Sequence, residues 1–596
     1  MAKEVIRIGG ASGFWGESAM ATPQLLQAGN LDYIVYDYLA EITMSIMARA
    51  RAKDPTKGYA TDFVSAALKP NLVEIAKQGV KILSNAGGVN PAACGDAVRA
   101  VIKELGLDLK VAVVTGDDLI DRAAELAEKP FADMFSGDTF PDASRLASIN
   151  AYLGGFPVAA ALAEGADIVI TGRSVDSAVT LGACIHEFGW GTEEWEKLAG
   201  GSLAGHILEC GPQATGGNFT DWRLVADTID RIGYPIAEVS ADGSFVTTKP
   251  DDTGGIVNVG TVSEQMLYEI GDPQAYMLPD VICDFSDVEI TEEAPNRVRV
   301  TGTKGYPAPT TYKVSATYAD GFRGGTVMTF YGSDADEKAE AYTNAAIARA
   351  RNVLRSANMP DFTETSVEII GAESQYGAAR QVGSVREVAA KLAAKHPDAA
   401  GIGILLKEST GLGLATPPGL SGFAGARSKP SPVVRLFSFV IPKTDVPIEI
   451  DVDGRKVPFD VFKGAPFEEK ALERPKPPAA PSDATVEVPL VKLAWGRSGD
   501  KGNKANVGII ARKADYVPYI WAALSEKAVS DYYAHFLEGD VHRFYMPGSN
   551  AINFLMDDIL GGGGVASIRN DPQGKGYAQL LLDYPIPVSK EIAEAL

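Results

Sequence analysis

Short apolar runs alternate with longer segments of helical periodicity over the first third of the chain. Five runs are rich in β-branched residues and are followed by small or polar residues: 5–8, 33–36, 81–83, 110–114 and 167–170. Runs of this length predict buried strands, and their alternation with helices predicts a mostly parallel sheet joined by crossover helices. The hydrophobic pattern therefore predicts an α/β fold for the N-terminal region.

The pattern changes after residue 220. Strands are predicted at 245–250, 297–301, 312–318, 367–370, 401–406 and 433–441, and helices at 335–358 and 387–395. Gly and Pro interrupt the apolar pattern between 411 and 425, a composition typical of a lid or interface loop. The sequence thus predicts one large α/β region over 1–465, made of a parallel-sheet part (1–220) and an α+β part (221–465).

A proline-rich segment separates this region from the end of the chain. Four prolines fall within residues 475–481 and predict a semi-rigid extended linker, placed at 466–485. Residues 486–596 again alternate strands, the last at 577–582, with helices, and predict a small C-terminal α+β domain. A predicted tight turn at 497–503 presents Arg497, Asp500 and Lys501, which either bind an anionic group or dock this domain on the first.

Polar residues follow the predicted parallel strands. In such sheets the loops at the carboxyl ends of the strands lie together along one edge, where ligands bind. Each residue is also explained by an ordinary role in a turn or a helix cap, because Asn, Asp, Ser and Gly are what turns need. The residues expected to meet at this edge are Asp37, Glu41, Asn85, Asn90, Asp117, Asp118, Arg173 and Asp176.

The segment 205–218 concentrates reactive side chains in a chain with only 5 His and 4 Cys. His206 lies three residues before Glu209 and four before Cys210, so a helical turn puts all three on one face. His, Glu and Cys side chains can act as base, acid or nucleophile, and Cys210 is the weaker candidate. Gly216 and Gly217, which follow, allow a ligand to approach the backbone. The alternative is a buried helix with a satisfied histidine and an inert thiol.

Two glycine-rich loops follow predicted strands. The first, at 9–13, does not fit G-x-G-x-x-G, which disfavours a nicotinamide or flavin cofactor, and it does not fit the P-loop of nucleoside triphosphatases. Tight turns of this kind can still aim backbone amides at an anion or an enolate oxygen. We therefore expect substrate contacts from Gly9, Gly10, Ser12 and Gly13 and from Gly87 and Gly88.

Composition narrows the classes of function. The formal net charge of −22 disfavours binding to nucleic acid or to an anionic membrane. The cysteines Cys94, Cys184, Cys210 and Cys283 lack Cys-x-x-Cys spacing, which argues against a zinc ribbon, an iron–sulfur cluster or a disulfide framework. No apolar run is long enough to span a membrane, and a strand is predicted directly at the N-terminus. We expect a cytoplasmic protein, a homo-oligomer, with no metal and no tightly bound cofactor.

Several long motifs carry a resemblance to a known family. They are Ile8–Gly16, Asp37–Glu41, Asn85–Pro91, His186–Trp190 and Gly205–Gly217. Over residues 5–450 the chain resembles the AtuA-like proteins of acyclic terpene utilisation, and its last domain resembles the small AtuA-like domain, to which a ferredoxin-like fold is assigned. The resemblance implies a role in the catabolism of citronellol- and geraniol-type compounds and branched-chain acids through coenzyme A thioesters.

Together these observations predict an enzyme acting on a branched acyl-coenzyme A, by hydration or dehydration or by retro-aldol cleavage. His206 or Glu209 is the predicted base or acid, Asp37, Glu41 and Asp176 line the pocket, and the glycine-rich loops supply backbone donors. Two alternatives remain open. One is a noncatalytic acyl-coenzyme A binding or scaffold subunit working beside a carboxylase, and the other is an oxidoreductase.

Overall fold

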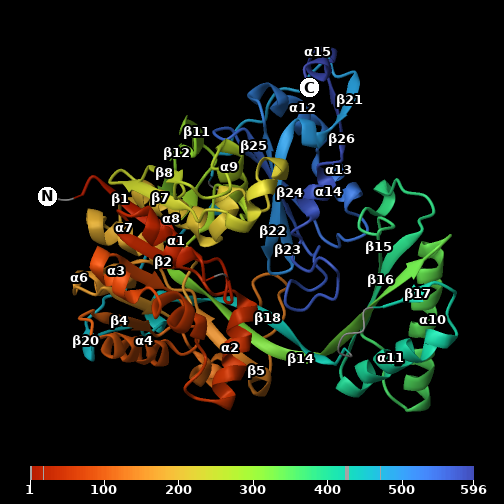
Figure 1. Cartoon of the computed structure of the whole chain (residues 1–596), viewed down its shortest axis with the longest axis horizontal. Helices are drawn as coiled ribbons and strands as arrows, with labels where there is room; N and C mark the ends of the chain where they lie inside the picture. The colour runs from red at the N-terminus through yellow and green to blue at the C-terminus, as the bar shows by residue number, and fades with distance from the viewer. Residues whose placement is uncertain (1–2, 18, 423–427, 470–471) are drawn as a thin grey trace.

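The computed structural model describes residues 3–17, 19–422, 428–469 and 472–596 (Figure 1). Eleven strands of this described chain form one mixed sheet in the body of the molecule. Its centre is parallel, in the order β1 (Val5–Gly10), β2 (Tyr33–Tyr36), β3 (Lys81–Ser84), β6 (Ile168–Thr171) and β4 (Val111–Thr115). The five sequence-predicted strands are therefore confirmed, and they pair as predicted.

Antiparallel strands from later in the chain extend this sheet at both edges. Beside β1 lie β7 (Ile236–Ser240), β8 (Phe245–Thr248), β12 (Arg297–Thr301) and β11 (Glu289–Ala294). Beside β4 lie β19 (Glu449–Val452) and β20 (Arg455–Val457). Residues 221–301 and 449–457 thus join the sheet that the first 171 residues begin.

Both faces of the central sheet are covered. Tyr33 and Val35 enter one hydrophobic core, while Ile34 and Tyr36 enter the other, as expected when successive residues of a strand point to opposite faces. The first core also contains side chains of α6 (Phe156–Ala163), α7 (Ala178–Phe188) and α8 (Trp195–Glu209). The second contains side chains of α1 (Ala21–Ala28), α2 (Glu41–Lys53), α3 (Leu72–Gln78) and α4 (Pro91–Leu105).

A long strand carries the chain out of this body. β14 (Thr311–Tyr331) pairs at its start with β5 (Leu146–Ala151) and β18 (Ser431–Pro442). Its far end pairs with β16 (Glu387–His396) and β17 (Leu420–Ser421), and β15 (Glu364–Ile370) completes this sheet. The helices α10 (Ala335–Ser356) and α11 (Ala399–Gly411) pack on it, forming the green lobe of Figure 1.

Two predictions in this lobe were wrong. Residues 387–395 were expected to be helical but form β16, and residues 401–406 were expected to be a strand but lie in α11. Ala and Lys favour helices, yet β16 is hydrogen-bonded on both sides, to β14 and β15, and this tertiary pairing overrides propensity. The interface loop predicted at 411–425 begins with the last residue of α11 and a 3-10 turn at Leu412–Leu414 and includes β17, and its residues 423–425 lie outside the described chain.

The C-terminal domain is a small antiparallel sheet with helices. Its strands run in the order β22 (Ala494–Lys501), β23 (Lys504–Ala511), β25 (Ala551–Met556) and β24 (Val541–Met546). The helices are α12 (Val517–Ala523), α13 (Glu526–Tyr532), α14 (Tyr577–Leu581) and α15 (Lys590–Glu594). A short pair, β21 (Val486–Pro489) and β26 (Pro585–Val588), closes the domain. The predicted α+β fold is confirmed, but the strand expected at 577–582 is wrong because that segment is α14.

Arg497, Asp500 and Lys501 do not lie on a tight turn as predicted. They belong to β22, which continues to Lys501, and the chain reverses at Gly502, whose φ is 64°. The linker passes from one domain to the other without forming an α-helix or a strand in its described residues 466–469 and 472–485. Arg474 anchors it to the first region through Asp272, with contacts of 2.6 and 2.8 Å.

Helix α8 runs without interruption through Gly200 and Gly201. A Cβ atom at Gly200 would lie 2.2 Å from the carbonyl oxygen of Gly243, and one at Gly201 would lie 2.8 Å from the ring of Trp190. The two glycines therefore permit close packing of the helix. This packing carries His206 and Glu209 to the carboxyl edge of the sheet.

This packing makes a prediction about stability. Gly200→Ala gains helix propensity but forces the helix away from the turn at Gly243, so we expect a net destabilisation of about 1–3 kcal/mol. Gly403→Ala in α11 is the matched control, because nothing lies within 4 Å of its Cβ position. Thermal unfolding should show a lower melting temperature for the first variant and an equal or higher one for the second. Equal stability of both variants would contradict the packing role.

Candidate active site

A cavity of about 330 Å³ lies where the carboxyl edge of the parallel sheet meets the C-terminal domain. The loop after β2 and the start of α2 supply residues 39–42, the loop after β6 supplies Arg173, Val175 and Asp176, and β14 supplies Lys313. The segment between α9 (Val259–Leu267) and β10 (Ile282–Asp284) supplies Glu269 and Tyr276, which begins the short strand β9 (Tyr276–Met277). The C-terminal domain contributes Asp500, Lys501, Gly564 and Gln573. The cavity is therefore shared between the two domains.

Three carboxylates meet beside this cavity. Asp37, Asp176 and Glu209 each offer an oxygen within 4.8 Å of the other two, although they are far apart in the chain. Burial, followed by repulsion from Asp176 and Glu209, raises the pKa of Asp37 well above its ordinary value. Burial likewise raises the pKa of Glu209, against the opposing effect of His206. Asp176 forms part of the cavity wall, whereas Asp37 and Glu209 lie behind it.

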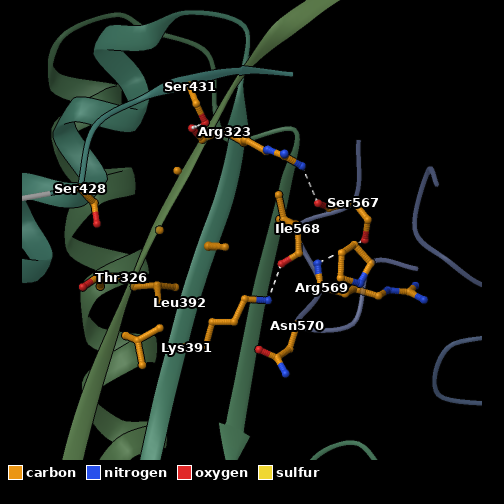
Figure 2. A pocket seen from close by; sticks show the side chains of 15 residues that line it. Arg323, Thr326, Lys391, Leu392, Ser428, Ser431, Ser567, Ile568, Arg569 and Asn570 are labelled. Atoms are coloured by element: carbon orange, nitrogen blue, oxygen red, sulfur yellow. Dashed lines mark hydrogen bonds between the residues drawn. The ribbon is translucent and has the colours of Figure 1, made fainter. Parts of the chain in front are cut away.

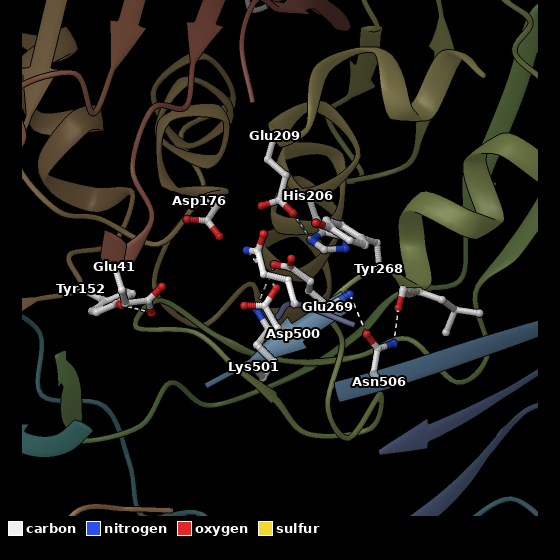
Figure 3. Close-up of polar contacts among 12 residues, drawn as sticks. Glu41, Tyr152, Asp176, His206, Glu209, Tyr268, Glu269, Asp500, Lys501 and Asn506 are labelled. Carbon is white, nitrogen blue, oxygen red and sulfur yellow. Dashed lines mark hydrogen bonds and ion pairs between the residues drawn. The ribbon is translucent and has the colours of Figure 1, made fainter. Parts of the chain in front are cut away.

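The predicted pair of His206 and Glu209 exists. Both lie in the last turn of α8, and Nδ1 of His206 is 3.1 Å from Oε1 of Glu209 (Figure 3). His206 is only 2% exposed, and in the described chain neither of its ring nitrogens has a partner in hydrogen-bond geometry. Burial opposes the imidazolium, but Glu209 outweighs it, so the pKa of His206 is raised. Neither residue reaches the cavity surface.

Cys210 caps the same helix and is partly buried. Burial, then the charge of Glu209, raises the pKa of its thiol well above the ordinary value. Because the thiolate is the nucleophile, this environment disfavours the predicted nucleophilic role of Cys210.

Glu41 lies on the opposite wall and is held as a carboxylate. The hydroxyl of Tyr152 donates a 2.6 Å hydrogen bond to it, and Lys313 lies 3.8 Å away. Burial opposes ionisation, but Lys313, Arg173 and Tyr152 outweigh it and lower the pKa of Glu41 to about 2. Arg173 stacks over the ring of Tyr152 and pairs with Asp176 at 3.0 Å. This wall therefore combines fixed negative and positive charges.

The C-terminal domain brings a second charged group. Lys575 pairs with Glu269 at 2.6 Å and with Asp500 at 3.0 Å. Burial and the neighbouring Glu269 raise the pKa of Asp500 to about 6, against the opposing effect of Lys575. Lys501 lies 3.9 Å from Glu269, and the acidic groups around it outweigh its burial and raise its pKa. Asp500 is thus a carboxyl group that changes protonation state near neutral pH, next to an ammonium group.

Two buried asparagines clip the domains together at this point. Asn506 on β23 accepts a 3.0 Å hydrogen bond from the amide of Glu269 and donates one of 2.6 Å to the carbonyl of Leu267. Asn553 on β25 donates to the carbonyls of Ile270 and Gly271 at 2.9 and 2.6 Å. Glu269 has a left-handed φ of 59°, a conformation that costs energy in a non-glycine residue. The hydrogen bonds of this asparagine clip therefore fix Glu269 next to Lys501 and Lys575.

The glycine-rich loops do not offer the expected backbone donors. The amides of Gly10 and Gly13 donate to the Pro235 carbonyl and to Glu17, and those of Gly87 and Gly88 donate to the carbonyls of Thr171 and Asn85. Gly10 and Gly13 also pack tightly against Leu208 and Cys210, and Gly9 against Leu25. Ser12 donates to the carbonyl of Asp37. These residues support the site by packing, and the four amides are already engaged by groups of the protein.

The remaining predicted binding residues either stabilise neighbouring segments or hold the C-terminal domain against the large region. Asn85 donates a 2.5 Å hydrogen bond to Asp37, whereas Asn90 caps α4 and holds the carbonyls of Pro55 and Lys57. Gly216, with φ 109°, and Gly217 form the turn after α8 and are not cavity residues. Arg497 bonds the carbonyl of Asn218 at 3.1 Å and stacks on Tyr268, which is the docking alternative that the sequence left open. Only Glu41, Arg173, Asp176, Asp500 and Lys501 of the predicted set line the cavity.

Sequence reasoning missed five groups around the cavity: Tyr152, Glu269, Tyr276, Lys313 and Lys575. Lys313 carried a usable signal, because a charged residue within a largely apolar strand pattern needs a partner. The other four lie in irregular segments or at their borders, where no periodicity marks them.

A larger cavity of about 580 Å³ lies elsewhere, between β14, β16 and the loop 567–572 (Figure 2). Its cations are already engaged: Arg323 donates to the carbonyl of Ser567 at 2.9 Å, and Lys391 to that of Ile568 at 2.6 Å. No cluster of carboxyl groups of the kind found at the smaller cavity is described there. We therefore place the candidate active site in the smaller cavity.

The fold and this site define a class of protein: an α/β protein with a charged cavity at the edge of its sheet, closed by a ferredoxin-like domain. Residues 6–452 match the model of the acyclic terpene utilisation family protein AtuA, and residues 488–587 match the AtuA ferredoxin-like domain. The chain therefore belongs to the AtuA family of acyclic terpene utilisation. No curated protein and no solved structure matched the chain. In the described parts of the chain, no helix has both the length and the apolar character needed to cross a membrane.

The asparagine clip leads to a second prediction. Asn506→Ala leaves the amide of Glu269 and the carbonyl of Leu267 without their buried partner, so we expect a loss of about 2–4 kcal/mol in stability. The C-terminal domain should also release from the cavity. A lower melting temperature and faster protease cleavage within residues 472–485 would show this. Asn352→Ala, on the exposed side of α10, should change neither; unchanged cleavage in Asn506→Ala would contradict the clip.

Proposed function

We propose that this protein is an enzyme that performs acid–base chemistry on an acyl-coenzyme A thioester, adding or removing water or cleaving a carbon–carbon bond. The single observation that carries the proposal is Asp500. Its carboxyl group titrates near neutral pH at the wall of a cavity that also presents Lys501 and Arg173. A base with a pKa near the working pH, beside groups that stabilise an enolate oxygen, is what these reactions require.

The roles follow from position. In the ionised state Asp500 would accept the proton from C2 of a 3-hydroxyacyl thioester, and the electron pair would form the enolate. Lys501 and Arg173 offer positive charge for the enolate oxygen. When the enolate collapses, the C3 hydroxyl leaves as water with one proton from an acid. In the retro-aldol alternative the base takes the hydroxyl proton, and the C2–C3 bond breaks to give the same kind of enolate.

Tyr276 is suited to supply the proton to the leaving hydroxyl. It lines the cavity, and burial raises the pKa of its phenol, which therefore stays protonated. We assign the acid role to Tyr276 and the base role to Asp500, in place of His206 and Glu209, because the latter pair does not reach the cavity surface.

The size of the cavity supports an acyl group as the enclosed part of the substrate. At about 330 Å³ it lies at the lower end of the range for small-molecule sites. A branched acyl chain fits this volume, and the much larger nucleotide part of coenzyme A would lie outside it. The AtuA family's link to acyclic terpenes agrees with branched acyl groups of this kind.

The test is to incubate the purified protein with branched enoyl- and 3-hydroxyacyl-coenzyme A esters and to follow their masses. We expect gain or loss of water, or a cleaved product. Asp500→Asn should lower kcat by about 10²–10⁴-fold, because it removes the base. Glu487→Gln, an exposed change on β21 of the same domain, is the control and should keep full activity.

The pH profile provides a third prediction that a purely structural role of Asp500 would not produce. Because its raised pKa is about 6, the carboxylate is present above pH 6 and is lost below it. We expect kcat/KM to fall about tenfold per pH unit below 6 in the wild type. The residual activity of Asp500→Asn should lack this step. No turnover of any ester by a cooperatively folded protein would favour the noncatalytic binding subunit, and a bound flavin or nicotinamide spectrum would favour the oxidoreductase.

A further inference from the structure

The three carboxylates beside the cavity are arranged as the ligands of a metal ion usually are. Asp37 follows β2, Asp176 follows β6 and Glu209 ends α8, and their nearest oxygens lie within 4.8 Å of one another. Oxygens that share one calcium-sized ion at 2.3–2.6 Å can be separated by up to roughly 5 Å. The spacing therefore allows a common ion without movement of the backbone.

Each of these carboxylates is oriented through one of its two oxygens. Oδ1 of Asp37 accepts hydrogen bonds from Asn85 at 2.5 Å and from the amide of Leu39 at 3.3 Å. Oδ1 of Asp176 faces Arg173 at 3.0 Å, and Oε1 of Glu209 faces His206 at 3.1 Å. In the described chain no hydrogen bond is made to the second oxygen of any of the three. Neighbours that hold one oxygen and leave the other available are typical of metal-binding carboxylates.

His206 is an independent sign that the cluster takes a ligand. It is 2% exposed, its Nδ1 faces Glu209 at 3.1 Å, and its Nε2 has no hydrogen-bond partner among the described residues. Buried polar groups are nearly always satisfied, so an exception of this kind needs an explanation. An ion at the cluster, with its bound water, would supply what the imidazole lacks.

The local charge balance favours a cation. Six carboxyl groups of the described chain surround the cavity, against four basic side chains that are not histidines. The carboxylates are Asp37, Glu41, Asp176, Glu209, Glu269 and Asp500, and the cations are Arg173, Lys313, Lys501 and Lys575. Lys501, Lys313 and Lys575 form no ion pair within 4.0 Å of the three clustered carboxylates. Carboxyl groups therefore outnumber the basic side chains, and the excess lies at the cluster.

We propose that Asp37, Asp176 and Glu209 bind a hard divalent cation of the Mg²⁺, Mn²⁺ or Ca²⁺ type. All three ligands are carboxylate oxygens, which such ions prefer, whereas a thiolate site for a softer metal would need ligands that this cluster does not contain. Because Asp176 is part of the cavity wall, the ion lies within reach of an oxygen of the bound substrate. Sequence spacing predicted no metal, since the three ligands come from segments that only the fold brings together.

The experiment is a titration of the metal-depleted full-length protein with Mn²⁺, followed by electron paramagnetic resonance of free Mn²⁺ and by calorimetry. We expect one saturable site and a higher melting temperature with Mn²⁺. Asp37→Asn and Glu209→Gln should weaken binding by at least about 10–100-fold. Asp176→Asn, at the more exposed position, tests the same site if the two buried variants unfold.

The control is Asp118→Asn. Asp118 follows β4 at the same edge of the sheet but pairs with Arg51 outside the cluster, so its loss should leave Mn²⁺ binding unchanged. No saturable binding in the wild type would overturn the proposal and would mean that protons neutralise the cluster. Equal binding by wild type and all three carboxamide variants would mean an adventitious ion only. Because no substrate is present, this result is independent of whether the proposed acyl-coenzyme A activity is found.

Discussion

Charged side chains can be buried only where neighbours of opposite charge or hydrogen-bond donors replace water. Here those neighbours come from two domains. Glu269 belongs to the large region, and its partner Lys575 belongs to the C-terminal domain. Docking therefore satisfies the charges and closes the cavity in one step, and neither domain carries the complete site alone.

The need to replace water around these buried charges also explains why polar side chains join the two domains. Asn506 and Asn553 bond to the backbone of residues 267–271 and not to the side chains of that segment, so they fix its path whatever the charge state of Glu269. Asp221 adds a two-pronged contact to Arg512, with both distances at 2.7 Å. Contacts of this geometry specify one relative position of the two domains, which an apolar interface would leave less defined.

The hydrophobic pattern was sufficient to locate the central sheet. Its strands are short and β-branched, and each is buried on both faces, so local sequence and tertiary environment agree. The lobe was harder because β16 is a sequence of Ala and Lys that becomes a strand only between two partners, and the pairing partners were invisible from the local pattern. Intrinsic propensity decides the secondary structure of a segment only where tertiary pairing does not.

The site could be predicted only in part, because the local pattern does not show which distant segments pack together. The rule that ligands gather at the carboxyl ends of parallel strands brought out Asp37, Glu41, Arg173 and Asp176 correctly as neighbours. The same rule covers only the loops that follow the parallel strands. It therefore missed Glu269, which lies between α9 and β10, and Lys575, which approaches from the C-terminal domain. Glycine was a misleading guide, because the close approach at Gly10 is to the backbone of α8.

β14 and β18 give the lobe an unusual relation to the rest of the chain. The last of their paired positions, Arg323 and Ser431, are cross-strand partners, so the chain leaves the body and returns to it at one point. The 107 residues between them, 324–430, therefore form a hairpin loop in the topological sense, grown into a folded lobe. A short turn in place of the lobe would preserve the connectivity of every strand in the eleven-stranded sheet. The lobe can therefore vary in evolution independently of the cavity at the edge of that sheet.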